Sequence, residues 1–157
     1  MDVSRVTKAS PELVDALARL LPQLAPGRET PGLPELEELL AATGASLLVA
    51  RDDAGTVVAM LMLLVYRIPT GLKARIDDVV VDEAARGQGA GEALTREAMR
   101  LAAEAGARMV ELTSRPEREA ANRLYRRLGF ERRETNLYVW HPVSETSLRD
   151  GAAAPRS

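Results

Sequence analysis

A stripe of leucines near the start of the chain recurs at helical spacing. Its members are Leu13, Leu17, Leu20, Leu21 and Leu24, at i, i+4, i+7, i+8 and i+11. This spacing predicts an amphipathic helix with one apolar face. Ser10 and Pro11 supply an N-cap and a first-turn proline, and Pro22 and Pro26 predict its end or a kink. The first helix of the chain therefore has an apolar face that must pack against another element.

Strand-like patterns dominate the middle of the chain. Residues 46–68 predict two strands joined by the turn Asp-Asp-Ala-Gly. Residues 74–83 contain three consecutive valines, which predict a central strand buried on both faces. The other expected elements are a short strand at 3–8, helices at 34–43 and 117–128, a helix of about fifteen residues before Gly106, and strands at 107–114 and 135–142. Together they predict a mixed α/β domain with one sheet.

Length and composition bound the classes of protein. The chain has 157 residues, 46% of them apolar, which suits one domain with one sizeable core. We expect this domain to span residues 1–143 and residues 144–157 to form a flexible tail, because the tail has little to bury. The net charge of −2 argues against a nucleic-acid binder. No apolar run approaches the ~18 residues that span a bilayer, so we expect a cytoplasmic protein without membrane contact.

The residue types present restrict the chemistry. The chain has no cysteine and one histidine, His141. Disulfides, thiol nucleophiles and thiolate or multi-histidine metal sites are therefore excluded. We expect no metal, and catalysis must use carboxylates, tyrosine or backbone groups.

A glycine-rich turn, Arg-Gly-Gln-Gly-Ala-Gly at 86–91, separates the valine strand from an alanine-rich helix. Backbone N–H groups at such a helix N-terminus favour an anion. The turn matches neither the dinucleotide fingerprint nor the Walker A loop. A helix entry that needs glycine only for tight packing remains the alternative.

The stretch VVVDEAARGQGAGEAL resembles the acetyl-CoA-binding motif of the GNAT superfamily of N-acetyltransferases, and AANRLYRRLGFERRE is similar to its second signature. The two motifs span about residues 76–131. The resemblance implies an α+β fold with a mostly antiparallel central sheet, splayed at the cofactor strand and flanked by helices on both faces. It also implies acetyl-CoA as co-substrate.

The resemblance assigns the cofactor contacts to two segments. The backbone of Val79, Val80 and Val81 would pair with the pantetheine arm. The N–H groups of the turn would hold the pyrophosphate; its residues are Arg86, Gly87, Gln88, Gly89, Ala90 and Gly91. Many relatives have a cofactor-binding asparagine where this chain has Arg118, and Asn122 is the expected substitute.

Acetyl transfer also needs a proton donor and a base. Tyr125 lies where the family commonly has the tyrosine that protonates the leaving sulfur; packing into the core is the alternative. Asp77 or Asp78 would accept the amine proton, with Asp77 preferred, or a water chain would deliver the amine neutral. Some relatives carry a catalytic glutamate where we align Thr113, so this chain has no glutamate for that role at that position.

These observations predict an acetyl-CoA-dependent N-acetyltransferase that works by direct transfer in a ternary complex, since no cysteine can carry the acyl group. The alternative is a non-catalytic acyl-CoA-binding or partner-binding module. The acceptor would be a small-molecule or peptide amine. Four glutamates hint at a cationic one: Glu29, Glu35, Glu37 and Glu38. Apolar surface on the hairpin and the last strand would also suit a homodimer.

Overall fold

The structure, a computed structural model, describes residues 1–142. The tail predicted for 144–157 lies outside the described residues. In chain order the elements are β1 (Asp2–Arg5), α1 (Pro11–Leu24), α2 (Leu33–Ala41), β2 (Ala45–Arg51), β3 (Val57–Ile68), β4 (Gly71–Val81), the 3-10 turn η1 (Glu83–Ala85), α3 (Ala90–Glu104), β5 (Val110–Glu111) and α4 (Glu119–Arg127). The mixed α+β class predicted from the sequence is confirmed.

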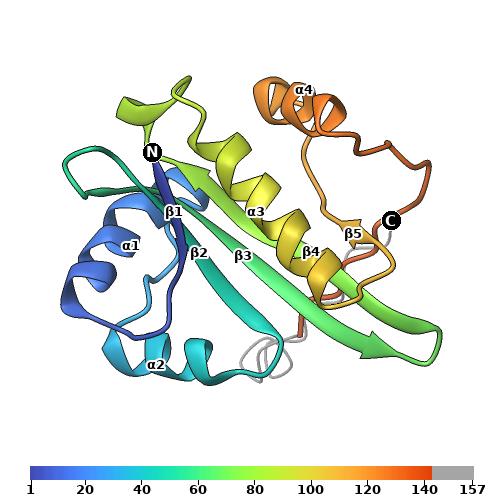
Figure 1. Cartoon of the computed structure of the whole chain (residues 1–157), viewed down its shortest axis with the longest axis horizontal. Coiled ribbons are helices and arrows are strands. Elements are labelled where there is room, and N and C mark those ends of the chain that lie inside the picture. Colours follow the sequence, from blue (N-terminus) through green and yellow to red (C-terminus); the bar gives the residue numbers. More distant parts are fainter. Residues whose placement is uncertain (143–157) are drawn as a thin grey trace, which may run out of the picture.

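The described strands form one sheet in the order β1-β2-β3-β4-β5. The first three pairings are antiparallel, and β4 pairs with β5 in parallel. Helix α3 supplies the connection from β4 to β5 and crosses one face of the sheet, while α1 and α2 cover the other (Figure 1). Helix α4 lies beyond the end of β5.

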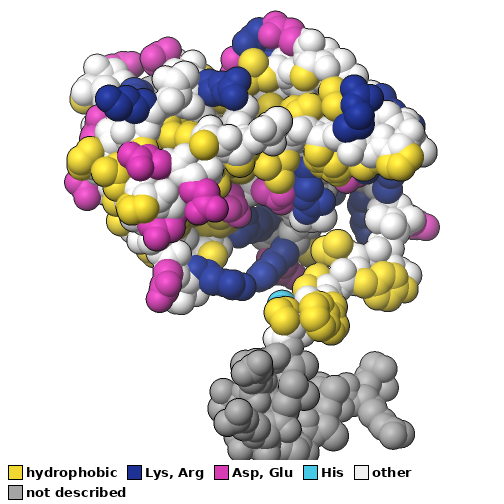
Figure 2. All heavy atoms as spheres, turned by 90° about the horizontal axis from the view of Figure 1, so that it is seen from below, with side chains coloured by type: hydrophobic (Ala, Val, Ile, Leu, Met, Phe, Trp, Pro, Cys, Tyr) yellow, Lys and Arg dark blue, Asp and Glu magenta, His cyan; other side chains and the backbone are white. Residues whose placement is uncertain are grey.

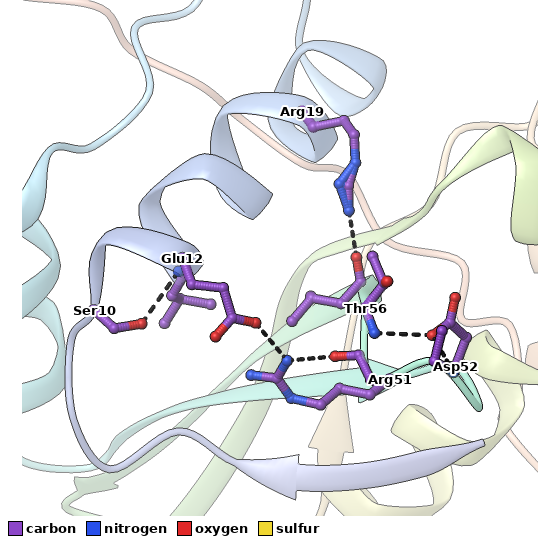
Figure 3. A network of polar contacts seen from close by, with 10 residues as sticks. Ser10, Glu12, Arg19, Arg51, Asp52 and Thr56 are labelled. Atoms are coloured by element: carbon purple, nitrogen blue, oxygen red, sulfur yellow. Dashed lines mark hydrogen bonds and ion pairs between the residues drawn. The ribbon is translucent and has the colours of Figure 1, made fainter.

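Helix α1 begins where the sequence predicts and is attached to the β2–β3 hairpin (Figure 3). The Ser10 hydroxyl accepts a hydrogen bond from the N–H of Leu13 at 3.2 Å, and so caps the helix. From the first turn, Glu12 forms an ion pair with Arg51 of β2 at 2.7 Å. Further along, Arg19 donates to the carbonyl of the first residue of β3. The helix continues through its internal proline to Leu24.

The sheet has an apolar cluster on each face. Alternate residues of β2 and β3 enter opposite clusters: Leu47 and Val49 pack with α1 and α2, whereas Leu48 and Ala50 pack with α3. Helix α3 presents a buried stripe of small residues and one leucine, made of Ala90, Leu94, Ala98 and Ala102. The continuous apolar runs of β2 and β3 follow from this double cover.

Three predicted features differ in the structure. The valine run of β4 was expected to be buried on both faces, but Val79 and Val81 are only half-buried because β5 does not accompany them. The strand predicted at 107–114 contracts to Val110–Glu111. The strand predicted at 135–142 is wrong for this structure: these residues form no strand, and Leu137 to Trp140 are exposed.

Candidate active site

A cleft opens where β4 and β5 part. Their ladder holds only two residue pairs, Ala74 with Val110 and Arg75 with Glu111. Beyond them, residues 76–81 of β4 continue without a neighbouring strand on that side among the residues that the structure describes, which is the splay implied by the resemblance. A cavity of about 1470 Å³ occupies this region, bounded by β4, the start of α3, the segment 112–118 and α4.

A β-bulge lies in the wall of the cleft. Met60 of β3 pairs with Val80 and Met62 pairs with Asp77, so two residues of β4 oppose the single residue between the two methionines. One of those two, Asp78, has φ of 48°, the one positive φ among described non-glycine residues. The bulge breaks the alternation of side chains, and both Asp77 and Asp78 line the cavity.

The glycine-rich turn forms the second wall. Gly87 and Gly89 have φ of 78° and 85°, and a Cβ built at either would meet no atom within 4 Å. Packing therefore does not demand glycine at these two positions. Within the described residues, the N–H groups of 87–92 donate to no other protein group. The turn thus leaves a row of backbone donors without a protein partner at the N-terminus of α3, and such a row is the arrangement that binds a phosphate.

Tyr125 reaches the cavity from α4. Its side chain is 9% exposed and packs edge-on against Phe130, with ring centroids 5.8 Å apart. Burial raises the pKa of Tyr125, an effect that the nearby charge of Arg118 partly opposes. The phenol therefore keeps its proton at neutral pH. Tyr125 is thus packed against Phe130 and also lines the cavity.

The two acids of β4 differ in their partners. Asp77 accepts a hydrogen bond from the guanidinium of Arg75 at 2.9 Å, and this contact raises the pKa of Arg75. Arg75 also reaches the hydroxyl of Thr113 at 3.4 Å. Asp78 is exposed, and no hydrogen bond to its carboxylate is seen in residues 1–142. Asp78 is thus the less engaged of the two.

A second ion pair lies next to the Arg75–Asp77 pair. Glu111 accepts a hydrogen bond from the ammonium of Lys73 at 3.0 Å, which lowers the pKa of the carboxyl. At the other end of the cleft, contacts from Arg127 and Arg96 lower the pKa of Glu92. The Glu92 to Arg127 contact joins the first turn of α3 to the last turn of α4. The negative charge of Glu92, which lies beside the free N–H groups, is therefore balanced by the charges of Arg127 and Arg96.

Most residues predicted for the site meet at this cavity, but two side chains do not. Asn122 lies outside its lining and donates its amide to the carbonyls of Arg115 at 3.0 Å and Pro116 at 3.5 Å. Gln88 also lies outside and reaches the carbonyl of Ala84 at 3.4 Å. Arg118 lines the cavity and donates to the carbonyl of Leu24 at 3.4 Å, linking α4 to the end of α1.

Sequence reasoning missed one residue that lines the cavity, Ser114, and one that contacts its wall, Arg75. Ser114 lines the cavity, and its hydroxyl oxygen is buried without a hydrogen-bond partner; no sequence signal marks it. Arg75 forms an ion pair with Asp77. The two residues are two positions apart on one strand, and this spacing could have indicated that their side chains lie on the same face. The glutamates that suggested a cationic acceptor, Glu29, Glu35, Glu37 and Glu38, are exposed and outside the lining.

In residues 1–142, no three histidine, cysteine, aspartate or glutamate side chains gather as a metal site. Over the same residues, no helix has the length and apolar character needed to cross a membrane.

Several solved structures share this fold. A transcriptional regulator from Bacillus halodurans is 26% identical with a TM-score of 0.73, covering 89% of this chain and 100% of its own. A ribosomal-protein-alanine N-acetyltransferase from Brucella melitensis is 24% identical with a TM-score of 0.71, covering 90% and 99%. An aminoglycoside acetyltransferase from an uncultured soil sample is 20% identical with a TM-score of 0.79, covering 91% and 96%.

Among curated protein sequences no match is found. The model of the acetyltransferase (GNAT) family, however, matches residues 13–130. This match includes the bulged strand, the glycine-rich turn and Tyr125, and it extends over well more than half of the chain. The chain therefore belongs to the GNAT family of acetyltransferases.

Proposed function

We propose that this acetyltransferase moves the acetyl group of acetyl-CoA to a primary amine by direct transfer in a ternary complex. The observation that carries the proposal is the convergence, in one cavity, of a free strand edge, a row of free N–H groups and a protonated tyrosine. The first two fit the two halves of the co-substrate. The third fits the leaving group.

Two walls of the cavity suit two successive parts of coenzyme A, the pyrophosphate and the pantetheine arm. The N–H groups of 87–92 suit a pyrophosphate, with Gly87 and Gly89 leaving room for it. The edge of β4 beyond Arg75 has no neighbouring strand to pair with, and the pantetheine arm carries amides that can pair with such an edge. Arg86 stands at the start of the turn, where it also forms an ion pair with Glu83 at 3.4 Å.

In the proposed reaction the neutral amine attacks the thioester carbonyl. A backbone N–H of β4 polarises that carbonyl, because the divergence from β5 leaves donors of β4 available. Asp78 is the favoured acceptor of the amine proton, since Asp77 is already engaged by Arg75. Tyr125 then donates its proton to the departing thiolate of coenzyme A. No acyl-enzyme on a thiol can form, because the chain has no cysteine.

The acceptor is proposed only as an amine. The aminoglycoside and ribosomal-protein enzymes of similar fold are named for very different acceptors, so the fold does not select between small molecule and peptide. We propose that the protein acts in the cytoplasm.

Release of coenzyme A gives a direct test. The protein has no cysteine, so a thiol reagent reports only the coenzyme A released, which allows a broad panel of amines to be screened. We expect turnover with at least one primary amine, and initial-rate lines that intersect when both substrates are varied. Parallel lines would contradict direct transfer. Binding of acetyl-CoA without release for any amine would support the non-catalytic module instead.

A further inference from the structure

Arg118 brings a positive charge to the wall of the cavity. Its guanidinium donates a long hydrogen bond, at 3.4 Å, to the carbonyl of Leu24 at the end of α1. On α4, Arg123 and Arg127 each form an ion pair with a glutamate. Among the residues that the structure describes, no carboxylate pairs with Arg118 in this way. The charge of Arg118 is therefore available to a ligand.

Arg118 lies at the end of α4 that is far from the free N–H groups of residues 87–92, here called the phosphate cradle. The contact of Arg127 with Glu92 joins the last turn of α4 to the first turn of α3, beside the cradle. Arg118 is the N-cap of α4, nine residues before Arg127, which is roughly 14 Å along a helix. Its guanidinium contacts α1 instead. Arg118 is thus remote from the place proposed for the pyrophosphate.

Tyr125 lies between these two ends of the cavity wall. It follows Arg118 by seven residues, which puts both residues on one face of α4. The charge of Arg118 also acts on the Tyr125 hydroxyl, where it opposes the effect of burial on the pKa. In the proposed reaction, pantetheine reaches Tyr125 from the cradle. The side of the tyrosine toward Arg118 is then left for the acceptor amine.

The same cavity also carries a negative charge that is not engaged. Asp78 lines the cavity, and in the described part of the chain its carboxylate accepts no hydrogen bond and forms no ion pair with Arg118. Figure 2 shows side chains of both charges around the hollow between the body and the chain that leads to the grey residues. Leu137, which belongs to that chain, lines the cavity. One small molecule with an amine and a carboxylate would complement two such separated charges.

Further donors lie in the same segment as Arg118. Ser114 lines the cavity, and its hydroxyl oxygen is buried without a hydrogen-bond partner. The N–H groups of residues 119–121, in the first turn of α4, line the cavity too and donate to no other group within residues 1–142. A carboxylate accepts hydrogen bonds from each of these kinds of donor, and a helix N-terminus favours a negative charge. The segment therefore suits an anionic group of the acceptor.

We propose that the acceptor is a free amino acid, whose carboxylate binds Arg118 and whose amine lies toward Asp78 and Tyr125. This inference rests on the proposed acetyl transfer and names the class of its acceptor. The amine nitrogen bonds to the thioester carbonyl carbon, and the bond from that carbon to sulfur breaks. The amine proton passes to Asp78, and the thiolate takes the proton of Tyr125. Both side chains return to their starting states by exchanging one proton with water, and the carboxylate is unchanged.

The amide of the same amino acid provides the matched comparison. It keeps the amine and the side chain but removes the negative charge. A site built around a charged partner rejects an analogue that lacks it, because its own groups are then left unpaired. A nearby carboxylate stabilises the ammonium form, so the amine of the acid is harder to deprotonate than that of the amide. A preference for the acid therefore cannot come from the basicity of the amine.

Release of coenzyme A is measured for the common amino acids, each beside its amide. We expect kcat/KM for the best amino acid to exceed that for its amide about 10- to 100-fold. Arg118→Gln should remove this preference by raising KM for the acid, with KM for the amide and the Kd of acetyl-CoA unchanged. Arg118→Lys keeps the charge and should retain part of the preference. Arg126→Gln, at an arginine of α4 outside the cavity lining, is the control and should retain all of it.

Two results overturn the proposal and leave acetyl transfer to amines intact. The first is a wild type that uses amides as well as acids. The second is an Arg118→Gln variant that loses affinity for acetyl-CoA but keeps the preference, since Arg118 would then serve the co-substrate.

Binding separates the two proposals if no amine releases coenzyme A. The melting temperature of the acetyl-CoA complex is then followed with the same acids and amides. A rise with an acid that is absent with its amide and lost in Arg118→Gln supports the carboxylate site and refutes acetyl transfer. No rise with any acid refutes both.

Discussion

Replacing Gly89 by alanine tests the phosphate cradle most directly. Gly89 is the N-cap of α3 with φ of 85°, and a Cβ there would meet nothing within 4 Å. The variant therefore adds no clash to the free protein. It adds backbone strain, and it places a methyl group on the side of the turn where the free N–H groups are open.

A matched control separates the two effects. Gly55, in the turn between β2 and β3, has the same φ of 85° and the same open surroundings, but it is outside the cavity between β4 and α4. A left-handed conformation costs a residue with a Cβ about 1–2 kcal/mol. Gly55→Ala and Gly89→Ala should therefore lower the melting temperature similarly, by roughly 2–8 °C for a chain of this size.

Only Gly89→Ala should weaken coenzyme A binding. Charge-assisted hydrogen bonds contribute about 1.5–3 kcal/mol each, so displacing one of them raises the dissociation constant roughly 10- to 100-fold. Calorimetric titration of both variants with coenzyme A measures this. Equal affinities for wild type and both variants, in folded protein, would refute the cradle and leave Gly89 with a role in helix entry alone. The bulkier Gly89→Glu, which also adds a negative charge, should abolish binding.

Three other predictions concern Leu94, Ser114 and Tyr125. Leu94→Ala empties the fully buried centre of the α3 face and should lower the free energy of unfolding by about 2–5 kcal/mol in denaturant titration; a loss below ~1 kcal/mol would mean that α3 is not packed as described. Ser114→Ala removes a buried hydroxyl that has no partner, so the melting temperature should hold or rise, because an unsatisfied group costs about 1–3 kcal/mol; a clear fall would reveal a hidden hydrogen bond. Burial raises the pKa of Tyr125 above its ordinary value, so its contribution to stability is complete below the unfolded pKa near ~10 and is lost as the pH rises through the folded pKa. Tyr125→Phe should therefore lose less stability than the wild type between neutral and strongly alkaline pH. Parallel profiles of stability against pH for the variant and the wild type would contradict this. The same variant should lower the rate of coenzyme A release about 10²–10⁴-fold.

The helices and the hairpin were predictable because their signals are local. Ser10 and Pro11 mark the start of α1, and the spacing of Leu94, Ala98 and Ala102 defines the buried face of α3. Caps, stripes and turn residues act within a few positions of one another. Such signals predict a helix or a turn without knowledge of the tertiary contacts.

The site was predictable as a place but not in its details. The family motifs located β4, the turn and Tyr125, and the structure brings these to one cavity. The bulge at Asp78 was not foreseen, because a positive φ there depends on the register between β3 and β4. The hydrogen bonds of the Asn122 amide to the carbonyls of Arg115 and Pro116 were not foreseen either, because they depend on the geometry of the loop before α4.

The failed prediction of a strand at residues 135–142 has a physical cause. Strand propensity measures how well a side chain suits a pleated, half-covered surface, and it contains no information about which edge supplies the partner. Residues 135–142 satisfy the propensity, yet no strand edge within residues 1–142 is paired with them. The pattern of residues 135–142 therefore predicts only that the segment is able to pair. Whether it pairs, and with which edge, is decided by tertiary contacts that the local pattern does not contain.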